Sequence, residues 1–230
     1  MKKTVKTLLS IFATLVFCSS FAFADSLLPT PLAIDPGDLI YGMTYGDWSA
    51  VWWQYIVSTP RTDNPLYGAD CSSRQSGPVF FLVGSADGST VTRSCTMPKG
   101  KILFAPIINA EISEGEIASG QPNDEYALRV AATAVADCFI PSSLKVTVDG
   151  IPLQNLRRLR VQSPAFTFNV VDSSILGIGY TGPKKSSVAD GYWFALNPLP
   201  TGNHTIHFEG TYFDGTNKST QNVTYHLTVK

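Results

Sequence analysis

Long apolar runs are missing from all but the start of this sequence. After residue 24 no stretch reaches the ~18 consecutive apolar residues that a membrane-spanning helix needs, so no transmembrane segment is predicted. Residues 1–24 have the order of a secretory signal peptide: the cationic MKKTVK, the apolar TLLSIFATLVF, and AFA before the cleavage site. We therefore expect a signal peptide at 1–24 and a single exported domain at 25–230, located in the periplasm or outside the cell.

An excess of basic residues is also missing. Cleavage after residue 24 removes Lys2, Lys3 and Lys6, which leaves 14 basic residues against 18 acidic ones and a net charge of −4. A protein that binds nucleic acid by electrostatics needs a basic surface to displace the counterions of the phosphates. The composition therefore argues against a nucleic-acid partner.

Catalytic and cofactor-binding signatures are absent from the sequence. It contains no GxSxG, HExxH, CxxC, P-loop or GxGxxG motif, and its three histidines are His204, His207 and His226. A Ser-His-Asp triad would have to take its base from the C-terminal strands, where nothing places a nucleophile. We expect no cofactor, and the sequence leans towards a protein that is not an enzyme.

Cysteine is scarce after the signal peptide. An exported chain meets an oxidising environment, so the three cysteines that remain predict one disulfide and one thiol left over. Cys71 and Cys95 lie in polar, turn-rich sequence, whereas Cys138 ends an alanine-rich helical pattern. The sequence predicts a Cys71–Cys95 disulfide and a buried Cys138; a catalytic thiol at Cys138 is the alternative.

Most of what is present has the pattern of β-strands. PVFFLVG at 78–84 and KILFAPII at 101–108 are continuous apolar runs, typical of strands covered on both faces. LKVTVDGIPL at 144–153 predicts a hairpin around Asp149-Gly150, and Pro152 places its second strand at an edge. Further short strands follow. The sequence predicts a mainly β fold: a single β-sandwich or jelly-roll-like domain with two short helices packed on it.

Two segments have helical signatures. The first runs from about Asp47 to Ser58, and the second covers 122–141, with Asn123 as its N-cap and Pro141 as its stop. In the second segment the small residues at 127, 131, 134 and 138 form a stripe that would pack closely on a sheet. Both helices are expected to cover a sheet of the predicted sandwich.

Three of the four tryptophans fall within the first helix. Trp48 and Trp52 share one face with three further apolar residues at helical spacing, which predicts a core-facing stripe. Trp53 lies about 140° from Trp48 around the helix. Either a second layer of protein covers its ring, or the ring lines a groove and stacks on a ligand, so Trp53 is a candidate ligand-binding residue.

The outward face of the C-terminal hairpin carries His207, Glu209 and His226, which are the ligand types of a zinc site. A two-residue turn at 214–215 would separate the two histidines by ~13 Å, whereas a four-residue loop at 214–217 would make them diagonal neighbours. The alternative is an ordinary solvated sheet face. We expect no metal, and these three residues are the candidates if one is bound.

Two polar clusters offer further candidates. INAEISEGE at 108–116 follows a buried strand, so Glu111 and Glu116 are candidates for general acid and base and Asn109 for ligand binding. An ordinary solvated loop has the same composition. Arg158 and Arg160 are candidates for holding an anionic sugar or a phosphate, with a solvated strand face as the alternative.

Several blocks occur along the chain in a fixed order: YGDWSAVWWQY, SGPVFFLVGS, TRSCTMPKGKILFAPIIN, RVQSPAFTFNV, and TGNHTIHFEG followed by VTYHLTV. In these blocks the chain resembles a group of uncharacterised secreted bacterial proteins that share them in this order. The resemblance covers nearly the whole chain after residue 24 and implies export and a single domain. It implies no activity and no catalytic residues.

Two functions of different classes follow from these patterns. The first is a secreted non-catalytic binding protein for a glycan or for an envelope or host surface partner, favoured by export, the β-rich pattern and the missing motifs. The alternative is a secreted hydrolase of cell-wall or polysaccharide material that uses Glu111 or Glu116. A deep pocket around both glutamates would favour the hydrolase, and a shallow aromatic groove would favour binding.

Overall fold

The computed structural model describes residues 32–117, 124–177, 181–183 and 186–230. The described residues all belong to one compact unit, Pro31–Lys230. The predicted signal peptide and its cleavage site therefore lie outside the described residues. Within the part that is described, no helix is long and apolar enough to cross a membrane.

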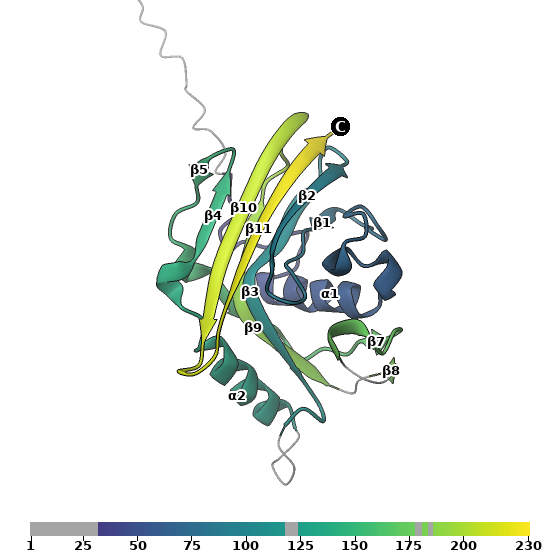
Figure 1. Cartoon of the computed structure of the whole chain (residues 1–230), viewed down its shortest axis with the longest axis vertical. Coiled ribbons are helices and arrows are strands. Elements are labelled where there is room, and N and C mark those ends of the chain that lie inside the picture. The colour runs from purple at the N-terminus through teal and green to yellow at the C-terminus, as the bar shows by residue number, and fades with distance from the viewer. Residues whose placement is uncertain (1–31, 118–123, 178–180, 184–185) are drawn as a thin grey trace, which may run out of the picture. The chain divides into compact units, whose positions relative to one another are not determined.

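The described part of the chain is mainly β, as the sequence predicts (Figure 1). The helices are α1 Tyr45–Val57 and α2 Glu125–Ala136, with short 3-10 helices at Arg61–Asp63, Pro65–Tyr67, Pro141–Ser143, Leu156–Leu159 and Ile175–Gly177. The strands are β1 Val79–Phe81, β2 Thr90–Met97, β3 Ile102–Ser113, β4 Lys145–Val148, β5 Ile151–Pro152, β6 Arg160–Gln162, β7 Asn169–Val170, β8 Gly182–Pro183, β9 Ser187–Leu196, β10 Gly202–Phe213 and β11 Lys218–Val229.

Two main sheets pack face to face as a β-sandwich. The first has the strand order β1-β3-β9-β6 and the second has the order β2-β11-β10-β4-β5, while β7 and β8 form a separate pair. Buried side chains from both main sheets belong to one hydrophobic cluster, in which the rings of Phe194 and Phe208 have centroids 5.7 Å apart. The predicted sandwich is therefore confirmed.

The four-stranded sheet is covered on both faces, because α1 packs on the face opposite the second sheet. Within the run 78–84, Phe80 and Leu82 belong to the cluster between the sheets, whereas Val79, Phe81 and Val83 belong to the cluster around α1. β1 pairs in parallel with β3, and every residue of β9 is buried. The continuous apolar runs therefore form strands without a solvent face, as predicted.

The tryptophans of α1 are core residues. Trp48 is 7% exposed and Trp52 is 3% exposed, and the Trp52 indole lies edge-on against Trp193 with ring centroids 5.4 Å apart. Trp53 is 9% exposed and belongs to the same cluster, which also contains Phe166 from the segment after β6. A second layer of protein therefore covers Trp53. This burial favours the core interpretation, and the role of Trp53 in ligand binding stays a prediction.

The second helix differs from the prediction in its buried face. Its N-cap is Asp124, whose side chain accepts a hydrogen bond from the Ala127 N–H at 2.9 Å, and Asn123 lies outside the described residues. The buried stripe consists of Leu128, Ala132 and Ala136 rather than the predicted small residues at 127, 131, 134 and 138. Leu128, the largest apolar side chain on this face, packs with Val188 of β9, and this contact sets the rotation of the helix.

The cysteines confirm one part of the prediction and correct another. Cys71 and Cys95 are joined by a disulfide, with their Cα atoms 5.8 Å apart. Cys138 is free, but it is only partly buried rather than enclosed in the core. It follows the last turn of α2, where its Sγ lies 3.5 Å from the Ala134 carbonyl oxygen.

The first hairpin has the turn that the sequence predicts, and the second has the longer of the two turns considered. Asp149 and Gly150 have φ angles of 52° and 79°, so both central residues adopt the left-handed conformation of a type I′ turn, and Val148 pairs with Ile151. β5 lies at the edge of its sheet, as Pro152 predicts. Residues 214–217 form a four-residue loop between β10 and β11, which fixes the register of these two long strands.

Candidate functional site

Two of the candidate metal ligands, His207 and His226, are neighbours across β10 and β11, but His207 and Glu209 contact other side chains. Thr205 pairs with His226 across β10 and β11, so His207 and His226 are diagonal neighbours, as the four-residue loop predicts. The His207 Nε2 atom lies 3.2 Å from the Asn222 Oδ1 atom, and Glu209 forms an ion pair with Lys145 at 3.1 Å. Within the described ranges, no three His, Cys, Asp or Glu side chains gather in a way that could hold a metal ion.

Glu111 and Glu116 both lie beside Ser113 at the end of β3. The Ser113 hydroxyl donates a hydrogen bond to Glu111, and the Ser113 main-chain N–H donates one to Glu116. Asn109 lies two residues before Glu111, and its buried Oδ1 atom has no hydrogen-bond partner among the described residues. Neither glutamate lines the two hollows described below.

Arg160 and Arg158 have different surroundings. The Arg160 guanidinium lies between two carboxylates, with Nε 3.0 Å from Asp190 Oδ1 and Nη1 2.6 Å from Asp137 Oδ1. These contacts join β6 to β9 and to the end of α2, so Arg160 is committed to the fold and is not a free anion site. The Arg158 side chain is exposed and has a 3.7 Å contact with Asp35.

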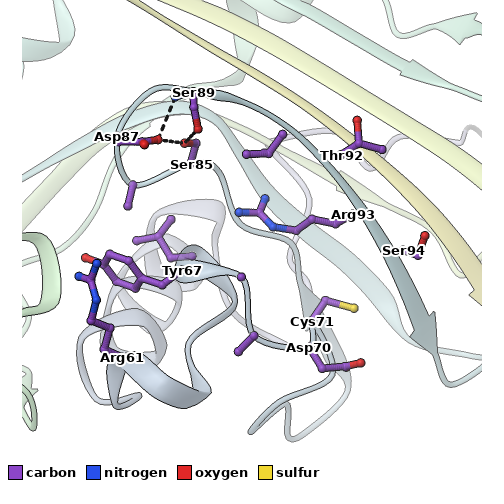
Figure 2. Close-up of a pocket in the computed structure, with 15 residues that line it drawn as sticks. Arg61, Tyr67, Asp70, Cys71, Ser85, Asp87, Ser89, Thr92, Arg93 and Ser94 are labelled. Atoms are coloured by element: carbon purple, nitrogen blue, oxygen red, sulfur yellow. Dashed lines mark hydrogen bonds between the residues drawn. The ribbon is translucent and has the colours of Figure 1, made fainter.

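A different place in the fold forms a hollow with a polar lining. We call it the β2 hollow: a space of about 750 Å³ between residues 61–71 on one side and residues 85–94, which include the first half of β2, on the other. Figure 2 shows Arg61, Tyr67 and Asp70 on one wall and Arg93 reaching towards the space from β2.

Residues 61–71 are held in place by polar and covalent contacts. The side chain of Asn64 is fully buried: its Nδ2 atom donates to the Ile56 carbonyl at the end of α1, and its Oδ1 atom accepts from the Leu66 N–H. This side chain fixes the start of the 3-10 helix Pro65–Tyr67 to α1. The Cys71–Cys95 disulfide joins the other end of the segment to β2.

Two aspartates at the hollow are bound within their own turns. The Asp87 Oδ1 atom accepts hydrogen bonds from the Ser85 hydroxyl at 2.6 Å and from the Ser89 N–H at 3.0 Å. Asp70 accepts in the same way from the hydroxyl and N–H of Ser72. These bonds lower the pKa of both carboxyl groups, so both stay ionised at neutral pH and are weak bases.

Two guanidinium groups complete the lining. The Arg93 Nη1 atom donates to the Val83 carbonyl at 3.3 Å and to the Tyr225 hydroxyl at 3.4 Å, which leaves its Nε and Nη2 atoms without a partner among the described residues. The Arg61 guanidinium lies over the Tyr67 ring, 3.8 Å from its centroid. The hollow therefore offers both signs of charge, serine and threonine hydroxyls, and one aromatic ring.

A smaller hollow of about 350 Å³ shares Asp70 and Ser94 with the β2 hollow. Residues of β10 and β11 line it, including His204 and His226. The His204 Nδ1 atom is 2.7 Å from Asp149 Oδ2, and its Nε2 atom is 2.9 Å from the Pro200 carbonyl oxygen. Both ring nitrogens therefore face acceptors, which favours the doubly protonated imidazolium.

The contact between His204 and Asp149 predicts that the stability of the fold depends on pH. Burial lowers the pKa of His204, but its hydrogen bonds to Asp149 and Pro200 outweigh burial and raise the pKa above its usual value. A raised folded-state pKa stabilises the fold below about pH 6.5, the unfolded value, and this contribution is lost as pH rises through the folded value. We expect the free energy of unfolding to fall over that window by up to about 1 kcal/mol, because the Asp149 partner is largely exposed.

Urea unfolding at a series of pH values measures this contribution. The His204→Gln variant should lose the decrease above pH 6.5, whereas His226→Gln, which removes an exposed histidine of the same hollow, should keep it. An unchanged pH profile in His204→Gln would show that the His204–Asp149 pair contributes nothing to folding.

Comparisons with known proteins add little to this geometry. No family model and no curated protein matches the chain. Among solved structures, the chain is similar to the cysteine protease inhibitor EhICP2 from Entamoeba histolytica, with 9% identity and a TM-score of 0.25 over 67% of this chain and 100% of that one. The solution structure of amebosin has 14% identity and a TM-score of 0.20 over the same shares. Likenesses this weak carry no argument.

Proposed function

We propose that this protein is an exported, non-catalytic binding protein and that its ligand, a glycan or a segment of an envelope or host surface protein, binds in the β2 hollow. The observation that supports this most is the lining: hydrogen-bonding groups from two segments converge on one open space and are fixed there by a disulfide. Such convergence of a few polar groups is what fixes a ligand's orientation.

The same lining gives little support to catalysis. Among the described residues, this lining contains no histidine, no lysine and no free cysteine. Its two carboxylates are held ionised by their own turns, which makes them poor general acids and weak general bases at neutral pH. Binding is therefore the function for which these groups are suited.

Export is supported by the crosslink and by the sequence. Structural disulfides persist in oxidising compartments and are rare in the cytosol. The Cys71–Cys95 bond joins the two walls of the hollow, so the proposed binding site contains a bond that forms in the proposed compartment.

The test is to screen the exported chain on a glycan array and on displayed peptides, then to compare two arginine variants. Arg93→Gln should weaken binding at least tenfold, because it removes the charged donor of the hollow. Arg158→Gln, an exposed arginine outside the hollow, should bind like the unchanged protein. A lack of binding to both ligand classes, or loss of binding in Arg158→Gln alone, would contradict the proposal.

The same screen addresses the hydrolase hypothesis. Incubation of the bound ligands or of purified cell-wall material should release no product if the protein only binds. Product release that disappears in Glu111→Gln or Glu116→Gln would instead favour the hydrolase.

A further inference from the structure

The two main sheets have four outer edges, and three of them are closed or short. At β1, the Gln75 side chain accepts from the Phe81 N–H at 3.1 Å and donates to the Phe81 carbonyl at 2.8 Å, so it occupies the place of a neighbouring strand. β5 has two residues and contains Pro152, and β6 has three residues. β2 has eight residues and, within the described ranges, pairs with β11 alone. Proteins normally block an edge of that length.

The register shows which main-chain groups of β2 are unpaired. The Lys230 N–H donates to the Met97 carbonyl at 3.2 Å, so the polar main-chain groups of Met97 point towards β11. The pairing is unbroken from Thr90 to Met97, and the two sides of a strand alternate residue by residue. The N–H and C=O groups of Thr92 and Ser94 therefore point away from β11.

The β2 hollow lies on that unpaired side. Both Thr92 and Ser94 line it, and Figure 2 shows the space on the side of β2 away from the other strands of the sheet. In the described part of the chain, the main chains of these two residues form no hydrogen bond outside the sheet. A further strand would lie about 4.8 Å from β2, within the hollow, and would find two donor and two acceptor groups in register.

The charged residues of the β2 hollow indicate which side chains an added strand would carry. Figure 2 places Arg93 between Asp87 at one end of the hollow and Asp70 at the other. A side chain directly opposite Arg93 on a paired strand lies within reach of its unpartnered Nε and Nη2 atoms. An acidic residue complements Arg93 there, and basic or polar residues complement the two aspartates near the ends.

We propose that the open edge of β2 binds an extended peptide segment of a partner protein by strand addition, with main-chain hydrogen bonds to Thr92 and Ser94 and an acidic side chain beside Arg93. This inference rests on the proposed binding function and narrows its ligand to a peptide. Strand addition obtains affinity from the main chain and specificity from alternate side chains.

The first experiment selects displayed random heptapeptides on the exported chain and on its Arg93→Gln variant. Peptides enriched on the unchanged protein should carry a central Asp or Glu, and this preference should disappear on Arg93→Gln. Enriched peptides without an acidic preference, or with the same preference on both proteins, would overturn the role given to Arg93.

The second experiment methylates the main-chain nitrogens of an enriched peptide, one position at a time. A strand uses every second N–H towards its neighbour, so methylation at alternate positions should weaken binding about tenfold, while methylation at the positions between them should change it less than threefold. This measurement leaves the protein unchanged and therefore does not depend on how any variant folds. A flat methylation profile would rule out strand addition.

A matched pair of variants tests the edge from the protein side. Thr92→Pro removes an edge-facing N–H inside the hollow, and proline is tolerated on edge strands at such positions. Thr96→Pro removes an equivalent edge-facing N–H that lies outside the β2 hollow. The first should weaken peptide binding about tenfold and the second less than threefold; equal effects would overturn the inference.

If glycans bind and peptides do not, the proposed function stands and the strand-addition inference fails; if neither class binds, both fail.

Discussion

Trp52→Ala is expected to lower the free energy of unfolding by about 3–5 kcal/mol, the range for removing a large buried ring. Trp52 is 3% exposed and contacts both Trp53 and Trp193, so its loss leaves a cavity between α1 and the four-stranded sheet. Its Nε1 atom also donates to the Leu82 carbonyl at 2.9 Å, and that buried acceptor would lose this bond. Urea unfolding followed by circular dichroism measures the change.

The matched control is Tyr126→Ala. Tyr126 is an aromatic residue of α2 that is 76% exposed, so its truncation should change the free energy of unfolding by less than about 0.5 kcal/mol. A loss below about 1 kcal/mol for Trp52→Ala would mean that the cluster around α1 contributes little to stability.

Arg160→Met should lower the free energy of unfolding by about 3–5 kcal/mol, because it leaves a buried carboxylate without its charge partner. The Asp190 side chain is 5% exposed and receives two hydrogen bonds from the guanidinium. The hydrogen bond to Asp190 also raises the pKa of Arg160. The variant is measured by urea unfolding at pH 7.

A second substitution identifies the cause of that loss. In Arg160→Met combined with Asp190→Asn, no buried charge remains, so much of the stability should return. Arg158→Met, a neighbouring exposed arginine, should change the free energy of unfolding by less than about 0.5 kcal/mol. If the double variant is no more stable than Arg160→Met, the loss comes from packing and not from the unpaired carboxylate.

Periodicity along the chain was enough to predict the layers of this fold. Continuous apolar runs predicted buried strands, Asp149-Gly150 predicted a hairpin, and helical spacing predicted the core face that contains Trp52. The prediction placed the buried face of α2 on the wrong residues, because small residues occupy two neighbouring stripes of that helix and Leu128 selects between them.

The candidate site could not be predicted in the same way. The partners of Arg160 are 23 and 30 positions away in the sequence, so its pattern resembles that of a solvated arginine on a strand. The β2 hollow depends on which strand ends a sheet, and that order follows from long-range pairing. The serines around Asp87 are a local signal of a turn, but nothing local shows that this turn faces residues 61–71.

The Cys71–Cys95 crosslink makes the hollow conditional on redox state. One end of residues 61–71 is anchored to α1 through Asn64, while the other end is tied covalently to β2. In the reduced chain the edge of β2 is still present, but the facing wall loses its covalent link to that edge. Under the proposed function, the oxidised chain should therefore bind its ligand more tightly than the reduced chain, because the disulfide holds the facing wall of the hollow against β2.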